Sequence, residues 1–231
     1  MTEHKIQPQY HCLPIIAMLY VTSLLIANVT AFKIVQIGPV IFPAALVIFP
    51  LSYVFDDILT EVYGYQYSRR IIWTGLLSVW LFCLVGKVTT LLPAASFWPD
   101  QDAYRLVMNS VPRVVVASSI SYLVSEFLNS YLLAKLKIAF AGKHYWLRLI
   151  TSTGVGGAVD SLLFCSIAFA LVLPWSILLM LIFWQWVIKM SYEILVLPWT
   201  YLITNYLKRV EHEDHYDDQT NFNPFRFKIE R

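Results

Sequence analysis

Charged and amide side chains interrupt an apolar stretch of this chain between Trp184 and Pro198. Gln185, Lys189 and Glu193 are spaced by four residues, which places them on one face of a helix. A charge at the middle of a bilayer costs about 2.5 to 3.5 kcal/mol on insertion scales, so this face must turn toward protein, water or a ligand. Lys189 and Glu193 could neutralise each other, although lysine before glutamate is the weaker order. The alternative is a polar binding site.

Other apolar segments contain residues of the same kind. Asp160 follows a run of glycines, and small residues allow another helix or a ligand to come close. Glu126 and Asn129 lie on one helix face at i and i+3. Because Glu126, Asp160 and Glu193 are balanced only by Lys189, the sequence predicts an acidic polar site inside the membrane.

A flat heterocycle with donor groups along its edge would suit such a site. A carboxylate accepts paired N–H groups, an amide donates to a carbonyl, and aromatic side chains stack on a ring. The same residue types would also accept an amino acid, a vitamin or protons. The predicted substrate-binding residues are Asn28, Glu126, Asn129, Asp160, Gln185, Lys189, Glu193 and Trp186. We expect no catalytic residue, no metal ligand and no cofactor.

A second group of charges lies near the end of an earlier apolar run. Asp57 and Glu61 form an i,i+4 carboxylate pair, and Arg69 and Arg70 follow within a few residues. A charged gate or coupling group is one interpretation, and a solvated helix end in cytoplasmic water is the other. The predicted gate or coupling residues are Lys33, Asp57, Glu61, Arg69 and Arg70.

The elements that position these residues follow from composition. The chain is 58% hydrophobic and 14% charged, with a mean hydropathy of +0.60, values outside the usual range of soluble proteins. About 20 apolar residues cross the hydrocarbon core as a helix. We therefore predict an all-α integral membrane protein, a bundle of six transmembrane helices. The predicted spans are 13–32, 40–58, 71–92, 113–134, 149–173 and 176–206.

Lysine and arginine predict the orientation of the bundle. They are concentrated after the second, fourth and sixth spans, and cytoplasmic loops carry this excess. Both termini should therefore be cytoplasmic. Residues 1–210 form one transmembrane domain, whose first span is retained rather than cleaved as a signal peptide. Residues 211–231 are polar and acid-rich, which is typical of a solvated tail, although His212 and His215 could also hold a metal.

Several function classes lack the residues they need. Cys12, Cys83 and Cys165 are scattered over separate spans and suit neither a disulfide framework nor a metal spacing. No histidine lies in a predicted span, and the sequence has neither an H-E-x-x-H nor a G-x-S-x-G motif. We therefore predict that the protein is not an enzyme, while an integral membrane enzyme remains the alternative of another class. The overall charge of +2 gives no indication of a nucleic-acid partner.

The segment FPLSYVFDDILTEVYGYQYSRRIIW resembles the queuosine precursor transporter family, also called the vitamin uptake transporter family. RVVVASSISYLVSEFLNSYLLAKLK, LRLITSTGVGGAVDSLLF, the K-x-x-Y-E core of Lys189 to Glu193 and the tail HYDDQTNFNPF are similar to the corresponding family segments. The resemblance covers about residues 20 to 225. The family residues matched here are Asn28, Lys33, Asp57, Glu61, Gly64, Arg69, Arg70, Glu126, Asn129, Arg148, Asp160, Gln185, Lys189 and Glu193.

The resemblance implies a six-helix protein of the bacterial inner membrane. It would import 7-cyano-7-deazaguanine and 7-aminomethyl-7-deazaguanine, which are salvaged to make the queuosine of tRNA. A secondary importer needs no ATPase module and no nucleic-acid partner, and a homo-oligomer is compatible with it. The nearest alternative is the substrate-binding subunit of an energy-coupling-factor vitamin importer, which would need an ATPase.

Two positions depart from the family pattern. Asp56 stands where the family usually has glycine, which adds a carboxylate beside Asp57. Gly157 stands where the family usually has glutamine, which removes an amide one turn from Asp160. If that glutamine contacts substrate in other members, the selectivity of this chain differs.

Overall fold

The computed structural model describes residues 10–31, 33–169, 173–218 and 220–226 of the chain. These residues form α1 (Leu13–Thr30), β1 (Ile34–Ile37), β2 (Val40–Pro43), the 3₁₀ turn η1 (Ala44–Val47), α2 (Pro50–Tyr63), α3 (Tyr65–Leu91), α4 (Gln101–Ala139), α5 (Tyr145–Phe169) and α6 (Trp175–Val210). The predicted spans 13–32 and 149–173 include residues outside the described part, 32 and 170–172, and the predicted tail includes 219 and 227–231.

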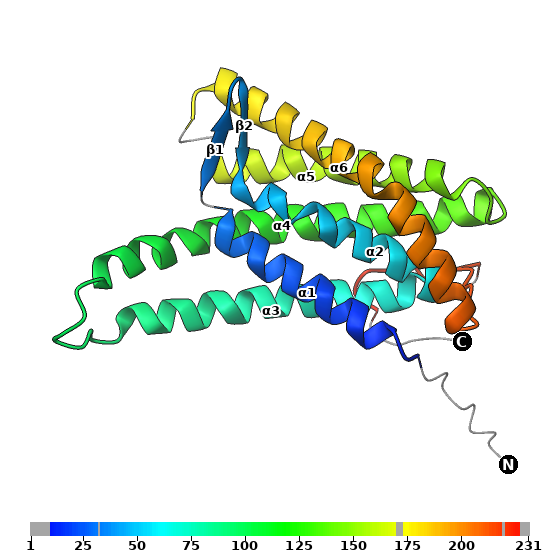
Figure 1. The fold of residues 1–231 in the computed structure, drawn as a ribbon, viewed down its shortest axis with the longest axis horizontal. Coiled ribbons are helices and arrows are strands. Elements are labelled where there is room, and N and C mark those ends of the chain that lie inside the picture. The colour runs from blue at the N-terminus through cyan, green and yellow to red at the C-terminus, as the bar shows by residue number, and fades with distance from the viewer. Residues whose placement is uncertain (1–9, 32, 170–172, 219, 227–231) are drawn as a thin grey trace, which may run out of the picture.

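The helices lie lengthwise beside one another in a bundle (Figure 1). α1 begins and α6 ends at one end, called here the terminal end, while β1 and β2 lie at the opposite end, called the hairpin end (Figure 1). α4 packs along α3 on one side and along α5 on the other, and α5 packs along α6. The terminal end therefore collects the start of α1, the junction of α2 with α3, the loop between α4 and α5, and the end of α6.

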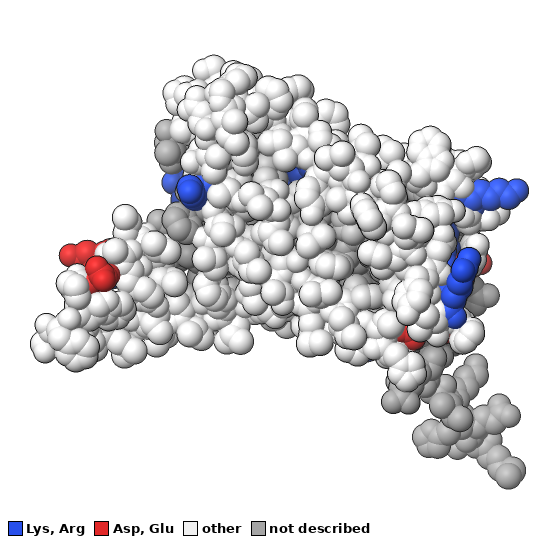
Figure 2. All heavy atoms as spheres, viewed as in Figure 1, with Lys and Arg blue, Asp and Glu red and all other residues white. Residues whose placement is uncertain are grey.

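Among the described residues, the helices α1, α3, α4, α5 and α6 are long and apolar enough to cross a membrane. Large apolar side chains such as Leu84, Leu91 and Leu195 are more than half exposed on their outer faces. Figure 2 shows that the charged residues of this face gather near the two ends of the molecule, and the wide band between them is nearly free of charge. An apolar belt of this kind suits lipid. The predicted helical membrane protein is confirmed in this general form.

The predicted span 40–58 is wrong as one continuous helix. Residues 34–43 form an antiparallel hairpin in which Ile34 pairs with Pro43 and Ile37 with Val40, and α2 begins only at Pro50. Proline lacks a backbone donor, so Pro43 can end β2, and Pro50 stands in the first turn of α2, where the missing N–H is not needed. The return from the hairpin end to the terminal end is thus made by η1 and the short α2.

Pro198 lies inside α6, where it removes one backbone hydrogen bond and bends the helix. Figure 1 shows α6 bending before it reaches the terminal end. The bend directs the last turns of α6 across the terminal end, where Lys208 meets the end of α2.

The described residues of 211–226, called here the C-terminal tail, fold back against the terminal end. The docked tail is still partly exposed, and the predicted polar cytoplasmic tail stays a prediction. Arg69 Nη1 donates to the carbonyl oxygens of Asn221 and Asn223, at 2.8 Å each, and Trp73 Nε1 donates to Pro224 O at 2.8 Å. The side chains of Arg69 and Trp73 on α3 thus bind the backbone of a polar segment whose composition alone indicates disorder.

Gly64 separates α2 from α3 and makes room for the tail. Its φ of +86° lies in the region that favours glycine, and a Cβ at this position would overlap the ring of His215. The backbone N–H of Tyr65 donates to Asp217 Oδ2 at 3.0 Å, which fixes the tail to the first residue of α3.

Candidate functional site

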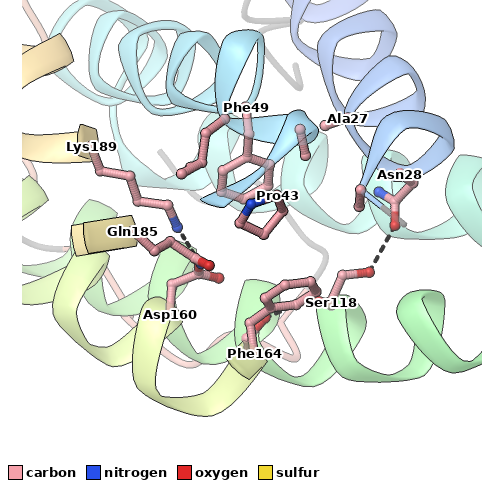
Figure 3. A pocket seen from close by; sticks show the side chains of 13 residues that line it. Ala27, Asn28, Pro43, Phe49, Ser118, Asp160, Phe164, Gln185 and Lys189 are labelled. Atoms are coloured by element: carbon pink, nitrogen blue, oxygen red, sulfur yellow. Dashed lines mark hydrogen bonds and ion pairs between the residues drawn. The ribbon is translucent and has the colours of Figure 1, made fainter. Parts of the chain in front are cut away.

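A pocket lies between α1, η1, α4, α5 and α6 (Figure 3). Its lining residue Pro43 ends β2, so the pocket lies toward the hairpin half of the bundle. Its empty volume is about 400 Å³, which includes space open to solvent. The lining residues are Ala27, Asn28, Ala31, Pro43, Ala45, Leu46, Phe49, Ser118, Ser121, Asp160, Phe164, Gln185 and Lys189. The irregular backbone of residues 43–49 therefore lines a cavity, which is the setting that membrane proteins require for non-helical segments.

Asp160 of α5 and Lys189 of α6 form an ion pair on the pocket wall (Figure 3). The Lys189 ammonium also lies 4.6 Å from the ring centre of Phe49 and 5.5 Å from that of Tyr53. The second oxygen of Asp160 has a distant donor, Ser125 Oγ at 3.5 Å. Asp160 is thus held by one cation and keeps acceptor capacity beside the cavity.

Two amides face the same cavity from different helices. Gln185 Oε1 accepts a hydrogen bond from Cys165 Sγ at 3.1 Å, and within the described residues its Nε2 has no acceptor. Asn28 donates from Nδ2 to Leu24 O at 2.9 Å and accepts at Oδ1 from Ser118 Oγ at 2.8 Å. Figure 3 shows the rings of Phe49 and Phe164 between these polar groups. Gln185 therefore has a free donor, whereas Asn28 is largely occupied.

Behind Asp160 lies a set of buried acids, called here the acid cluster: Asp56, Asp57, Glu126 and Glu193. Asp56 accepts from Ser68 Oγ and from Ser130 Oγ, the latter at 2.6 Å. Asp57 accepts from Asn129 Nδ2 at 2.8 Å. Hydroxyl and amide donors thus satisfy the α2 carboxylates, but no residue of the acid cluster lines the pocket.

Glu126 differs from its neighbours in the acid cluster. Its side chain is fully buried, and neither of its oxygens has a hydrogen-bond partner in the described part of the chain. One oxygen of Glu193 is also without a partner there. Buried polar groups in native proteins nearly always have partners, so these atoms indicate a role beyond packing.

At the terminal end, Glu61 is the centre of a buried ion-pair group. Arg148 donates to both of its oxygens, at 2.6 and 3.1 Å, and Lys208 Nζ donates to Oε1 at 2.7 Å. Lys137 Nζ lies 3.6 Å from Oε1 and donates to Asp214 Oδ1 at 2.6 Å. The ion-pair group joins α2, α4, α5, α6 and the C-terminal tail.

The tail acids are tuned by these contacts. Partial burial acts to raise the pKa of Asp214, but hydrogen bonds and charges from Lys137 and Lys208 outweigh it and hold the pKa below its usual range. Partial burial acts in the same direction on Glu211, but the backbone N–H groups of Cys12 and His11 lower its pKa. Both carboxylates are therefore stable as anions that fix the tail.

The predicted substrate-binding residues divide into two groups. Asn28, Asp160, Gln185 and Lys189 line the pocket, whereas Glu126, Asn129 and Glu193 lie in or beside the acid cluster. Trp186 faces outward, is 36% exposed and donates to Gly154 O at 3.0 Å, so it does not line the pocket.

The predicted gate residues are also separated. Glu61 lies in the ion-pair group, Asp57 lies in the acid cluster, and Arg69 holds the tail. Arg70 is exposed on α3. Lys33 directly precedes β1, which lies at the hairpin end, and among the described residues no hydrogen bond or ion pair joins it to the other predicted gate residues. Glu61 is not a solvated helix end beside Arg69 and Arg70, because it is 1% exposed and pairs with other cations.

Sequence reasoning missed Phe49, Ser118, Lys137 and Lys208 as functional candidates. Phe49 precedes Pro50, and an aromatic residue before a helix-starting proline was a usable signal. The two lysines were assigned to topology alone, and their convergence on Glu61 depends on helix packing. Among the described residues, no group of three or more His, Cys, Asp or Glu side chains could hold a metal ion.

Comparison with known proteins identifies the family. A family model described as "Putative vitamin uptake transporter" matches residues 43–203, more than half of the chain. The chain is similar to a protein of Bacillus subtilis (strain 168) named "Probable queuosine precursor transporter", with 25% identity over 176 residues, 76% of this chain and 77% of the relative. No solved structure matches. The chain therefore belongs to the vitamin uptake transporter family and is a multi-pass membrane transporter, not an enzyme.

Proposed function

We propose that this protein imports 7-cyano-7-deazaguanine and 7-aminomethyl-7-deazaguanine across the bacterial inner membrane for the salvage of tRNA queuosine. The name of the Bacillus subtilis relative points to this substrate class. The observation that supports it most is the pocket, whose lining brings together a carboxylate, a free amide donor and aromatic rings.

The chemistry of a guanine-type base matches these groups. Such a base presents two adjacent N–H donors on one edge, which a carboxylate accepts together, and a carbonyl oxygen beside them. Asp160 is the acid on the pocket wall, so we assign the donor edge to it and the carbonyl to Gln185 Nε2. Phe49 and Phe164 would cover the ring faces.

The same assignment gives Lys189 and Asn28 supporting roles. Lys189 holds Asp160 in place and offsets its charge, which reduces the free-energy cost of burying a carboxylate in the membrane interior. Asn28 is occupied by Leu24 and Ser118, so it shapes the cavity from the α1 side rather than offering a free donor.

We propose an orientation in which the terminal end faces the cytoplasm, as the excess of lysine and arginine predicts. The pocket then lies toward the periplasmic half, and the Glu61 ion-pair group with the docked tail closes the cytoplasmic side. Import would open this closure and shift the 43–49 segment. In this proposal the transporter works as a secondary carrier, without an ATPase module.

Direct binding tests the substrate assignment. We would measure binding of both bases to the purified protein by calorimetry, for the wild type, Asp160→Asn and Asp217→Asn. Asp217 is the matched control, because it is also a buried carboxylate but contacts the backbone of Tyr65 far from the pocket.

We expect the wild type and Asp217→Asn to bind, and Asp160→Asn to lose at least about tenfold in affinity, since a carboxylate that accepts two donors becomes a neutral amide. The thermal unfolding of each variant separates lost binding from lost folding. If Asp160→Asn remains folded and binds as the wild type does, the pocket assignment is refuted. If no protein binds either base, the substrate assignment is refuted.

A further inference from the structure

Glu126 is the feature of the interior that substrate recognition leaves unexplained. It lies on α4, is fully buried, and does not line the pocket. In the described part of the chain neither of its oxygens accepts a hydrogen bond, and Asn129 Oδ1, one turn away, is also without a donor. An ionised carboxylate in such a place would lose its hydration without gaining hydrogen bonds or an ion pair to replace it.

The groups around Glu126 do not favour a second negative charge. Asp56 is ionisable but well supplied with donors from Ser68, Ser130 and Asn129, so it holds its own charge. Lys189 is the cation within range, and it is already paired with Asp160. The titratable groups that face Glu126 or its neighbours are Tyr20 from α1, Tyr53, Asp56 and Asp57 from α2, Tyr65 from α3, Tyr122 from α4, Asp160 from α5, and Lys189 and Glu193 from α6.

We propose that Glu126 carries the proton that couples transport to the proton gradient, an inference that rests on the proposed function. In the conformation described here Glu126 is protonated, and its hydroxyl hydrogen is available to the neighbouring Asp56. Release of that proton on the cytoplasmic side would complete the cycle. No covalent step is involved, because the proton moves between water and the carboxylate.

A proton fits this site better than a metal cation. A sodium ion would need several oxygen lone pairs converging on it. The Asp56 and Asp57 carboxylates already accept hydrogen bonds, since Ser130 Oγ lies 2.6 Å from Asp56 Oδ2 and Asn129 Nδ2 lies 2.8 Å from Asp57 Oδ1. In the part of the chain that the structure describes, no group of three or more His, Cys, Asp or Glu side chains could hold a metal ion.

Lys189 links the proton to the substrate. If Glu126 were ionised, Lys189 would be attracted to Glu126 as well as to Asp160. If Glu126 is protonated, Lys189 remains on Asp160, and the pocket keeps the arrangement that binds the base. Ser125 adds a second connection, because it precedes Glu126 and its Oγ lies 3.5 Å from Asp160 Oδ1. By linkage, the base and the proton then bind together, which is the requirement for symport.

Infrared spectroscopy tests the protonation without any substrate. A buried protonated carboxyl group has a carbonyl band distinct from that of a carboxylate. We expect the purified wild type to show such a band at neutral pH, Glu126→Gln to lose a component of it, and Asp56→Asn to keep it. An unchanged band in Glu126→Gln refutes the proposal. Absence of the band from the wild type at neutral pH also refutes the proposal, whether or not the variant folds.

Transport in liposomes tests the coupling. We expect wild-type affinity for 7-cyano-7-deazaguanine to fall by up to about tenfold per pH unit in the alkaline range, as the uptake of one proton requires. Glu126→Gln should bind without this pH dependence and should fail to accumulate the base against a gradient. Accumulation by Glu126→Gln at the wild-type level, or wild-type accumulation driven by sodium alone, overturns the proposal. A wild type that binds neither base at any pH refutes the proposed substrate instead, and the infrared result still decides the protonation.

Discussion

Glu61 and Glu126 are both buried glutamates, but their surroundings are opposite. Glu61 is in contact with Arg148 and Lys208 and lies near Lys137, so cations surround its carboxylate. Glu126 lies among Asp56, Asp57 and Asp160, and its oxygens have no donor within the described residues. One carboxylate is neutralised by partners fixed in the fold, and the other is not.

The difference shows that burial alone does not decide what an acid does in a membrane protein. Glu61 gains from its charge, because removing it would leave Arg148 without its carboxylate partner and would leave Lys137 and Lys208 with Asp214 alone. Glu126 gains from losing its charge, because no fixed cation is reserved for it. A permanent ion suits a closure that holds the terminal end together, and a group that changes its charge suits a transport cycle.

The largest expected effect comes from Glu61→Gln. The substitution leaves Arg148, Lys137 and Lys208 close together without their shared carboxylate, and breaking a buried pair costs about 3 to 5 kcal/mol. We expect a clearly lower temperature of unfolding in detergent and faster proteolysis of the C-terminal tail, because the same lysines hold Asp214.

Glu126→Gln is the matched control for Glu61→Gln. It makes the same change of atoms at a site of similar burial, but it leaves no cation without a partner. We expect its unfolding temperature to equal or exceed that of the wild type. Equal destabilisation of both variants would show that the two glutamates do not differ as described.

The sequence predicted the polar groups of the interior better than their partners. The spacing of Gln185, Lys189 and Glu193 correctly placed them on an inward helix face, because helical periodicity is a local property. Their contacts are not local. Lys189 pairs with Asp160 rather than with Glu193, since lysine reaches across to α5 where the two helices pack together.

The terminal end was harder to predict than the pocket. Arg148, Lys137 and Lys208 meet Glu61 from different helices, and nothing in their spacing along the chain indicates that they converge. The segment 40–58 was misread for a different reason. Its hydropathy is that of a span, but prolines override hydropathy where the backbone must form hydrogen bonds.

If the interior around Glu126 lacks stabilising ion pairs, close helix packing must hold it together. Gly156 of α5 lies against α4, and a Cβ there would be 3.2 Å from Ser125 O and from Asn129 Cβ. We expect Gly156→Ala to cost about 1 to 3 kcal/mol, because the backbone of α4 would have to shift. The measurement is the free energy of unfolding in detergent.

Gly157→Ala is the adjacent control. A Cβ at Gly157 would meet Lys189 Cδ at 3.8 Å and Trp186 Cδ1 at 3.9 Å, which are ordinary contacts. We expect a neutral effect or a gain of up to about 1 kcal/mol from better helix propensity. A larger loss in Gly157→Ala than in Gly156→Ala would contradict this account of the packing between α4 and α5.

The smallest expected effect concerns the pH dependence of tail docking, which tests whether the ion-pair group around Glu61 keeps its charges at physiological pH. Contacts with Lys137 and Lys208 hold the pKa of Asp214 below its usual range. A lowered pKa in the folded state stabilises tail docking above the unfolded value near 3.8, and this contribution is lost as the pH falls through the folded pKa. We therefore expect hydrogen exchange of residues 211–218 to remain slow from neutral pH to about pH 5 and to rise only below about pH 4, after correction for the intrinsic exchange rate.

Asp214→Asn should exchange several-fold faster at neutral pH and show a weaker acid transition, because an amide cannot offset the two lysines. Loss of protection near pH 6 in the wild type would instead contradict the assignment of the docking to Asp214 and its two lysines.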